Sequence, residues 1–320
     1  MTPKILGEAK GLRQLWGGFW SARVVLTANN YRVFEHLKSA KSAHEIAEIL
    51  GTDRRATEIL LDALAGLGLL RKTALKYRNT ALSNRLLISG SPYYQGDIIR
   101  HADILWKNWS GLDEVIKTGE PHHVAHDQNS FIRGMHNLAV FKARDVIRAV
   151  GLRGVRRALD LGGGPGTYAM EMAKKGVSVT LLDRPETVEI AKSVIKKSRV
   201  RNIRFLRGDF LYDDMGEGYD LIFISQVLHS CSDNESMQLV EKSKNALNPN
   251  GRVVIQEFSL DEDRAHPVRS ALFSVNMLVN TMAGRCYSLS EIKGWLSRAG
   301  LRDIRHRMMD DTVLVFGRKK

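Results

Sequence analysis

A glycine loop that joins an apolar strand to a helix is the sequence feature that most constrains the fold. Residues 160–167 read Asp-Leu-Gly-Gly-Gly-Pro-Gly-Thr, between an expected strand at Ala158–Leu161 and an expected helix at Thr167–Lys175. From this loop onward, short apolar runs alternate with helical segments, which predicts a parallel sheet with helices on both faces. The other expected strands are Ser178–Asp183, Ile203–Leu206, Tyr219–Ser225, Gly251–Phe258, Leu301–Arg307 and Val313–Gly317, and the other expected helices are Thr187–Lys197 and Asp233–Leu247.

The spacing of the glycines excludes two common phosphate-binding loops. The dinucleotide fingerprint G-x-G-x-x-G fails because the sixth residue counted from Gly162 is Thr167. The Gly-Lys-Ser/Thr ending of a P-loop is also missing. What remains is D-x-G-x-G-x-G, a loop whose backbone can approach a ligand closely.

Acidic residues follow the next two expected strands. Asp183 ends the second strand, 21 residues after Gly162, and Asp209-Phe210 follows the third. The first acid can accept hydrogen bonds from both hydroxyls of a ribose. The second can bind an adenine amino group while Phe210 packs on the ring. Each acid could instead cap a helix. With Asp160 at the glycine loop, however, there are three matches at the ends of consecutive strands, and these favour a ligand site because ligands of open α/β sheets bind there.

The first 120 residues have a different, helical pattern. Apolar residues recur at helical spacing through Trp16–Leu37. A capping box at Ser42 and Glu45, a helix at Arg54–Leu64 and a hairpin at Leu69–Lys72 and Lys76–Asn79 describe a winged helix. This fold reads DNA in some proteins and serves as a dimerisation module in others. The second helix is mostly apolar after its first turn, so we do not expect it to read bases.

The charge and the cysteine content indicate which cellular compartment and which partners to expect. The net charge of +13 raises nucleic acid as a partner, but the excess is divided almost evenly between residues 1–150 and 151–320. Two cysteines are too few for a disulfide framework, which suits a reducing compartment. No apolar run is long enough to cross a membrane, and the first ten residues lack a signal-peptide pattern. We expect a cytoplasmic protein without nucleic-acid or membrane partners.

The glycine loop resembles the first motif of class I S-adenosylmethionine-dependent methyltransferases, whose cofactor carries no phosphate. The whole chain is similar to the caffeate, acetylserotonin and hydroxyneurosporene type of small-molecule O-methyltransferase. The resemblance implies a helical winged-helix dimerisation domain at 1–120, connecting helices at 121–150, and a Rossmann-like domain with a mostly parallel seven-stranded sheet at 151–320. The motifs that carry it are Leu159–Thr167, Leu182–Pro185, Gly208–Phe210, Gln226–His229, Gly251–Glu257 and Phe273–Leu278.

The same resemblance implies a role for individual residues. His229 matches the general base of the family. The expected cofactor contacts are Asp160, Gly162, Gly164, Asp183, Arg184, Asp209, Phe210 and Ser225, and the expected acceptor-facing residues are Met135, Asn276, Met277 and Asn280. Two departures from the plant pattern stand near the base. Ser230 replaces the aspartate that follows the histidine, and Cys286 stands where a glutamate is usual, so Glu257 is the alternative acid for orienting His229.

The favoured function is methyl transfer from S-adenosylmethionine to a hydroxyl of a small, apolar acceptor by a homodimer. Three alternatives remain open: C-methylation of a ring such as a tetrapyrrole, a winged-helix DNA-binding regulator that senses the cofactor, and a catalytically inactive relative. The His122, His123 and His126 run has a spacing that could bind metal, but it follows Gly119-Glu120-Pro121 and is expected to be a solvated loop. We expect no metal site.

Overall fold

The computed structural model describes residues 3–320, and the chain forms two compact units, Met1–Asp103 and Ile104–Lys320. The division lies within helix α7 (Gly96–Trp109). The domain limits expected at residues 120 and 150 stay predictions. No helix within residues 3–320 has the length and apolar character needed to cross a membrane.

The first unit is a winged helix, as predicted. Ser42 and Glu45 form the expected capping box, and Gly51, in the left-handed region, ends that helix. A small antiparallel sheet, in the order β1-β3-β2, makes the wing, so this unit is helical but not all-helical. Its elements are α1 (Pro3–Gly17), α2 (Phe19–Asn30), α3 (Val33–His36), β1 (Lys41–Ser42), α4 (Ala43–Leu50), α5 (Arg54–Gly66), β2 (Leu70–Thr73), β3 (Lys76–Asn79) and α6 (Ala81–Leu86).

The helical pattern through Trp16–Leu37 belongs to three helices. The first break falls at Gly17-Gly18, between α1 and α2. The second falls at Arg32, which adopts a left-handed φ of 52° between α2 and α3. Apolar spacing alone does not reveal this turn, because Val33 and Phe34 are buried in the same core on its far side.

The second unit is built on a seven-stranded sheet with the strand order β6-β5-β4-β7-β8-β10-β9. All strands are parallel except β10, which pairs antiparallel with both β8 and β9. Every strand expected in this half of the chain is present. The bounds are β4 (Arg157–Leu161), β5 (Ser178–Asp183), β6 (Ile203–Arg207), β7 (Tyr219–Ser225), β8 (Leu247–Phe258), β9 (Arg302–Met309) and β10 (Thr312–Arg318).

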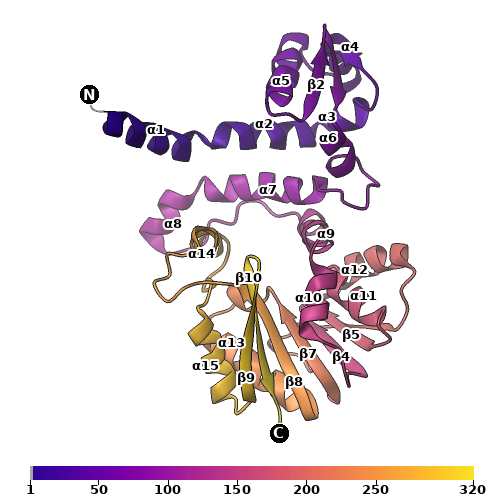
Figure 1. Ribbon diagram of the computed structural model, residues 1–320, viewed down its shortest axis with the longest axis vertical. Helices are drawn as coiled ribbons and strands as arrows, with labels where there is room; N and C mark the ends of the chain where they lie inside the picture. Colours follow the sequence, from indigo (N-terminus) through magenta and orange to yellow (C-terminus); the bar gives the residue numbers. More distant parts are fainter. Residues whose placement is uncertain (1–2) are drawn as a thin grey trace. The chain divides into compact units, whose positions relative to one another are not determined.

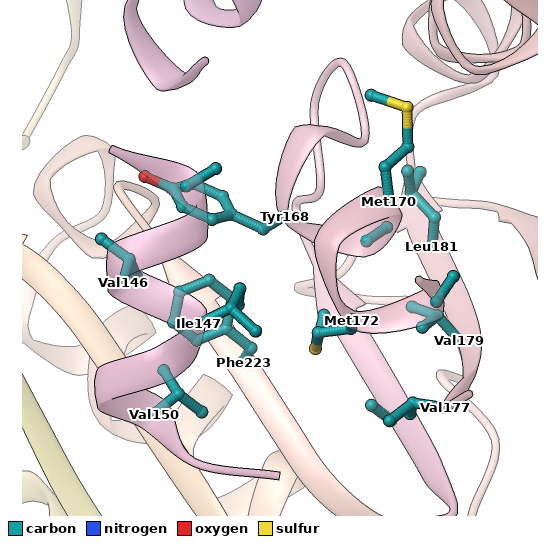
Figure 2. Close-up of a cluster of buried hydrophobic side chains, with 14 of the residues drawn as sticks. Val146, Ile147, Val150, Tyr168, Met170, Met172, Val177, Val179, Leu181 and Phe223 are labelled. Atoms are coloured by element: carbon teal, nitrogen blue, oxygen red, sulfur yellow. The ribbon is translucent and has the colours of Figure 1, made fainter. Parts of the chain in front are cut away.

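Helices cover both faces of this sheet (Figure 1). One face packs against α10, α11 and α12, and the other against α13 and α15. Successive strand residues point to opposite faces, so Phe223 joins the first core while Ile222 and Ile224 join the second. Figure 2 shows Phe223 among the side chains of α10, α11 and β5. The bounds are α8 (Leu112–Thr118), α9 (Gln128–Ala139), α10 (Ala143–Val150), α11 (Thr167–Ala173), α12 (Pro185–Ser198), α13 (Asp233–Ala246), α14 (Val268–Asn280) and α15 (Leu289–Arg298).

Candidate active site

The glycine loop holds together three segments that are distant in sequence. Gly162 follows β4 with a φ of +64°, and a Cβ atom there would lie 2.6 Å from Cγ2 of Val227 and 3.6 Å from Cε1 of Phe210. A side chain at this position would therefore clash as well as strain the backbone. The segments that follow β4, β6 and β7 consequently meet at the carboxyl edge of the sheet.

Asp160, expected to contact the cofactor, lies on β4, is buried, and is hydrogen-bonded to helix α11, which follows the glycine loop. Its Oδ2 accepts the backbone N–H of Ala169 at 3.0 Å, at the start of α11. Burial raises the pKa of this carboxyl to about 7, and the nearby Asp183 adds to the rise. In the structure Asp160 stabilises the turn from the glycine loop into α11, and its cofactor contact stays a prediction.

Asp183 links the end of β5 to the glycine loop. Its Oδ2 accepts the backbone N–H of Gly164 at 2.8 Å, and its Oδ1 accepts that of Arg184 at 2.8 Å. Burial raises the pKa of this carboxyl, although both hydrogen bonds act in the opposite direction. The Arg184 guanidinium lies 3.6 Å from Oδ2 of Asp209, which brings the third predicted acid to the same edge.

The segment after β6 is held by a hydrogen bond within itself and by hydrogen bonds from α13. Asp209 accepts the N–H of Leu211 through Oδ1 at 2.9 Å. Nζ of Lys242, on α13, donates to the carbonyls of Phe210, Leu211 and Asp213 at 2.9–3.1 Å. Lys242 could not be recognised from the sequence, because nothing distinguishes it from any other lysine on an amphipathic helix. Its contacts position Phe210 beside Gly162.

His229 and Glu257 form a buried pair. His229 lies in a short 3-10 turn after β7, and its Nδ1 is 2.7 Å from Oε2 of Glu257 at the end of β8. Oε1 of Glu257 accepts the backbone N–H of Leu228 at 2.8 Å, which fixes the carboxylate. The imidazole packs against Phe273 and Phe258, with ring centroids 5.0 and 6.0 Å away. Water therefore has little access to the ring, whose side chain is 12% exposed.

Cys286, where the plant pattern has a glutamate, cannot replace an acid. It is buried, and burial raises the pKa of its thiol to about 11. The same cause raises the pKa of the Cys231 thiol to about 11. Both thiols are therefore neutral near pH 7, and Glu257 is the acid in contact with His229.

Ser225, also expected to contact the cofactor, is tied to the neighbouring strand. Its hydroxyl donates to Oε1 of Gln256 at 3.0 Å, and Nε2 of Gln256 donates to Thr312 at 3.3 Å. Ser225 and Gln256 are register partners on β7 and β8, so their side chains point to the same face. The next residue, Gln226, has a left-handed φ of 59°, and its buried Nε2 has no hydrogen-bond partner within residues 3–320.

Two of the four residues expected to face the acceptor make other contacts. Oδ1 of Asn276 accepts the indole N–H of Trp109 at 2.9 Å, and Oδ1 of Asn280 accepts Nδ2 of Asn108 at 2.8 Å. These bonds tie α14 to the end of α7, across a sequence separation that no local pattern reveals. The amide oxygens of both asparagines are therefore engaged within the protein.

The two methionines lie on α9 and α14. Met277 is buried, whereas Met135 is half-buried. Beside Met135, Nδ1 of His136 lies 2.8 Å from the hydroxyl of Thr167, the first residue of α11. This contact, which the sequence analysis missed, holds α9 against the helix that follows the glycine loop.

The histidine run at 122–126 lies in a segment without helix or strand, as expected. Within residues 3–320, no group of three or more His, Cys, Asp or Glu side chains is arranged to hold a metal ion.

Comparisons with known proteins agree with this geometry. Residues 93–302 match the model of the O-methyltransferase domain, and residues 13–89 match the O-methyltransferase dimerisation domain. The chain belongs to the O-methyltransferase family. It is 31% identical to a 3-hydroxy-5-methyl-1-naphthoate 3-O-methyltransferase of Streptomyces sahachiroi, covering 95% of this chain and 92% of that protein. It is 32% identical to the acetylserotonin O-methyltransferase of Gallus gallus, covering 96% of each.

A solved structure shows the same architecture. Human N-acetylserotonin methyltransferase, in complex with S-adenosylmethionine, superposes with a TM-score of 0.89 at 27% identity, covering 98% of this chain and 97% of that one. The predicted fold class and family are thereby confirmed, and this O-methyltransferase has both domains of its family.

Proposed function

We propose that this O-methyltransferase transfers a methyl group from S-adenosylmethionine to the hydroxyl of a small aromatic acceptor, with His229 as general base. The observation that carries the proposal is the 2.7 Å contact between Nδ1 of His229 and the buried carboxylate of Glu257. A base that is hydrogen-bonded to an orienting acid, at the carboxyl edge of an α/β sheet, is a typical catalytic arrangement.

The residues at this edge fit the cofactor. The glycine loop presents backbone rather than side chains, and Asp183 and Asp209 supply carboxylates of the kind that bind ribose hydroxyls and an adenine amino group. Phe210 supplies an apolar ring beside Gly162. No cationic phosphate clamp is present in the loop, which suits a donor without phosphates. When bound, S-adenosylmethionine supplies an electrophilic methyl group on a positively charged sulfur.

The proton transfer follows from the hydrogen bonds of His229. Because the Glu257 carboxylate can only accept at Nδ1, the neutral imidazole carries its proton there and leaves Nε2 as the free base. As the acceptor hydroxyl takes up the methyl group that bound S-adenosylmethionine would supply, its proton would move to Nε2 of His229. Glu257 then stabilises the imidazolium, and general-base help of this kind is worth on the order of 10²–10⁴-fold in rate.

The surroundings of His229 favour an apolar, aromatic acceptor. Phe258 and Phe273 pack on the imidazole and against each other, with their centroids 4.5 Å apart. Such rings bind a flat apolar ring by offset or edge contacts. The relative from Streptomyces sahachiroi is named for a hydroxynaphthoate substrate, which carries its hydroxyl on a flat aromatic ring system.

The test is a binding and turnover comparison of His229→Ala with the wild type. S-adenosylhomocysteine should bind both proteins equally in a calorimetric titration, while methyl transfer to a panel of phenols and naphthols should fall at least ~100-fold. His306→Ala, an exposed histidine on β9, is the matched control. Unchanged turnover of His229→Ala would contradict the base assignment, and cofactor binding without transfer by the wild type would favour an inactive relative.

We also propose a homodimer formed through the N-terminal unit. Leu15, Trp16 and Trp20 on α1 and α2 are 81%, 59% and 65% exposed, and they lie within the segment that matches the dimerisation domain. An apolar surface of this kind usually marks an interface. Sedimentation should show a wild-type dimer that Leu15→Glu with Trp20→Glu converts to a monomer, while the control Leu75→Glu, at an exposed turn, stays dimeric. A monomeric wild type would contradict the proposal.

A further inference from the structure

A pocket of about 510 Å³ lies at the amino-terminal edge of the seven-stranded sheet. Its walls come from the segment before β4, the starts of β7 and β9, the early part of β8, and the end of the antiparallel β10. The glycine loop, Asp183 and His229 follow the carboxyl ends of their strands, so this pocket lies at the opposite edge from the candidate active site. Its volume is within the range of small-molecule sites.

Four arginines line the pocket: Arg153, Arg252, Arg305 and Arg318. Arg252 and Arg318 donate to the backbone carbonyls of Gly151 and Asn250, and Arg305 stacks over the ring of Phe316 at 4.6 Å. These contacts hold three of the four guanidinium groups in place without neutralising their charge. The pocket is therefore lined by a cluster of cationic hydrogen-bond donors.

Arg252 is half-buried, whereas the other three arginines are exposed. Its Nε is buried, and within residues 3–320 it has no hydrogen-bond partner. Burial lowers the pKa of this guanidinium, and Arg305 and Arg318 lower it further, while Asp220 acts in the opposite direction. An anion in the pocket would offset the mutual repulsion of the arginines.

Two acids also line the pocket, and they do not balance the cluster. Both carboxylate oxygens of Asp220 already accept hydrogen bonds from groups other than the four pocket arginines. Oδ2 accepts from the backbone N–H groups of Arg156 and Arg157, and Oδ1 accepts from Nδ2 of Asn248. Asp303, exposed on β9, is the second acid. Four guanidinium groups thus face two carboxylates, and the pocket carries a net positive charge.

We propose that this pocket binds a phosphate-bearing anion. Guanidinium groups bind phosphate through paired, charge-assisted hydrogen bonds, and several arginines that converge on one pocket suit a di- or triphosphate better than a single carboxylate. The only aromatic side chain in the wall, Phe316, is buried beneath Arg305, so it offers no ring for a base to stack on. Recognition therefore rests on the phosphate groups, which inorganic pyrophosphate and nucleotides share.

The test is calorimetric titration of the protein, saturated with S-adenosylhomocysteine, with inorganic pyrophosphate and with ATP. We expect one site per chain for each probe. Loss of two charged donors in Arg153→Gln with Arg318→Gln should weaken pyrophosphate binding at least ~10-fold. The matched control is Arg201→Gln with Arg204→Gln, which removes the same charge from exposed positions elsewhere and should keep the wild-type affinity within ~2-fold.

The outcomes separate a built site from general attraction to a basic protein. Equal affinity for the two probes means that phosphate groups alone are recognised, and tighter ATP binding adds a contribution from the nucleoside; either result supports the proposal. No binding of either probe, or equal weakening in the two double variants, would overturn it. Wild-type affinity in the Arg153→Gln with Arg318→Gln variant would also overturn the proposal.

Discussion

Glu257→Gln tests the tautomer on which the proposed proton transfer depends. In the proposed wild-type arrangement, Oε2 of Glu257 accepts a hydrogen bond from Nδ1–H of His229 at 2.7 Å, while Oε1 accepts one from the N–H of Leu228. In the variant, the amide oxygen can keep the bond to Leu228, but the amide nitrogen then faces Nδ1 as a donor. The imidazole must move its proton to Nε2, where the base is needed.

The size of the effect follows from this geometry. A charge-assisted hydrogen bond between buried groups contributes about 1.5–3 kcal/mol, or roughly 10–150-fold in rate, and the wrong tautomer removes general-base help as well. We expect kcat to fall by at least ~10²-fold. The Kd for S-adenosylhomocysteine should stay within ~3-fold, because the carboxylate of Glu257 is hydrogen-bonded to Leu228 and His229, whereas Asp183 is the acid that is bonded to the glycine loop.

The assay measures methyl transfer and S-adenosylhomocysteine binding on the same preparations, with thermal unfolding as a check on folding. Glu217→Gln, at an exposed position, is the matched control and should behave as the wild type. A kcat within ~3-fold of the wild type, in a folded Glu257→Gln variant, would refute the tautomer argument.

Three further predictions concern the cofactor edge of the sheet. Gly162→Ala should bind S-adenosylhomocysteine more weakly and lose ~1–3 kcal/mol of unfolding free energy, because its Cβ would lie 2.6 Å from Cγ2 of Val227. The control is Gly176→Ala, since Gly176 also has a positive φ but has open space around it; this variant should keep the wild-type affinity for S-adenosylhomocysteine. Asp160→Asn should stabilise the fold increasingly as pH rises from 4 to 7 in urea titrations. The native carboxyl keeps its proton to about pH 7, while the unfolded chain loses it near pH 4, so wild-type stability falls across that window; a difference independent of pH would contradict this. Lys242→Met should weaken the affinity for S-adenosylhomocysteine several-fold in calorimetric titrations, because the substitution removes the hydrogen bonds that hold the segment carrying Phe210. An unchanged Kd would show that Lys242 does not position Phe210 for the cofactor.

Much of the sheet could be predicted from the sequence because its signals are local. Most strands show as short apolar runs, the runs of β4, β5 and β6 are followed by or end in a glycine or an acid, and parallel strands bring those ends to one edge. The meeting of Gly162, Asp183, Asp209 and His229 follows from that topology. The left-handed turn at Arg32 carried no such signal, so three helices were expected as a single pattern.

The tertiary partners of the site residues could not be predicted in this way. Asn276 and Asn280 are hydrogen-bonded to side chains of α7 that lie more than 160 residues earlier in the chain. No local pattern in a single sequence predicts contacts between residues so far apart. Glu257 was named only as an alternative acid, because its distance from His229 depends on how β7 and β8 align. The lysine on α13 has no local signature at all.

The alignment of β7 with β8 has a consequence for how such enzymes can diversify. His229 and Glu257 extend from two strands that pair in register, Ser225 opposite Gln256, so the hydrogen-bond ladder sets the spacing of the proposed base and acid. The residues expected to face the acceptor lie on α9 and α14, outside that ladder. If the proposed roles hold, mutations on α9 and α14 can change which acceptor is bound while the sheet preserves the distance between His229 and Glu257.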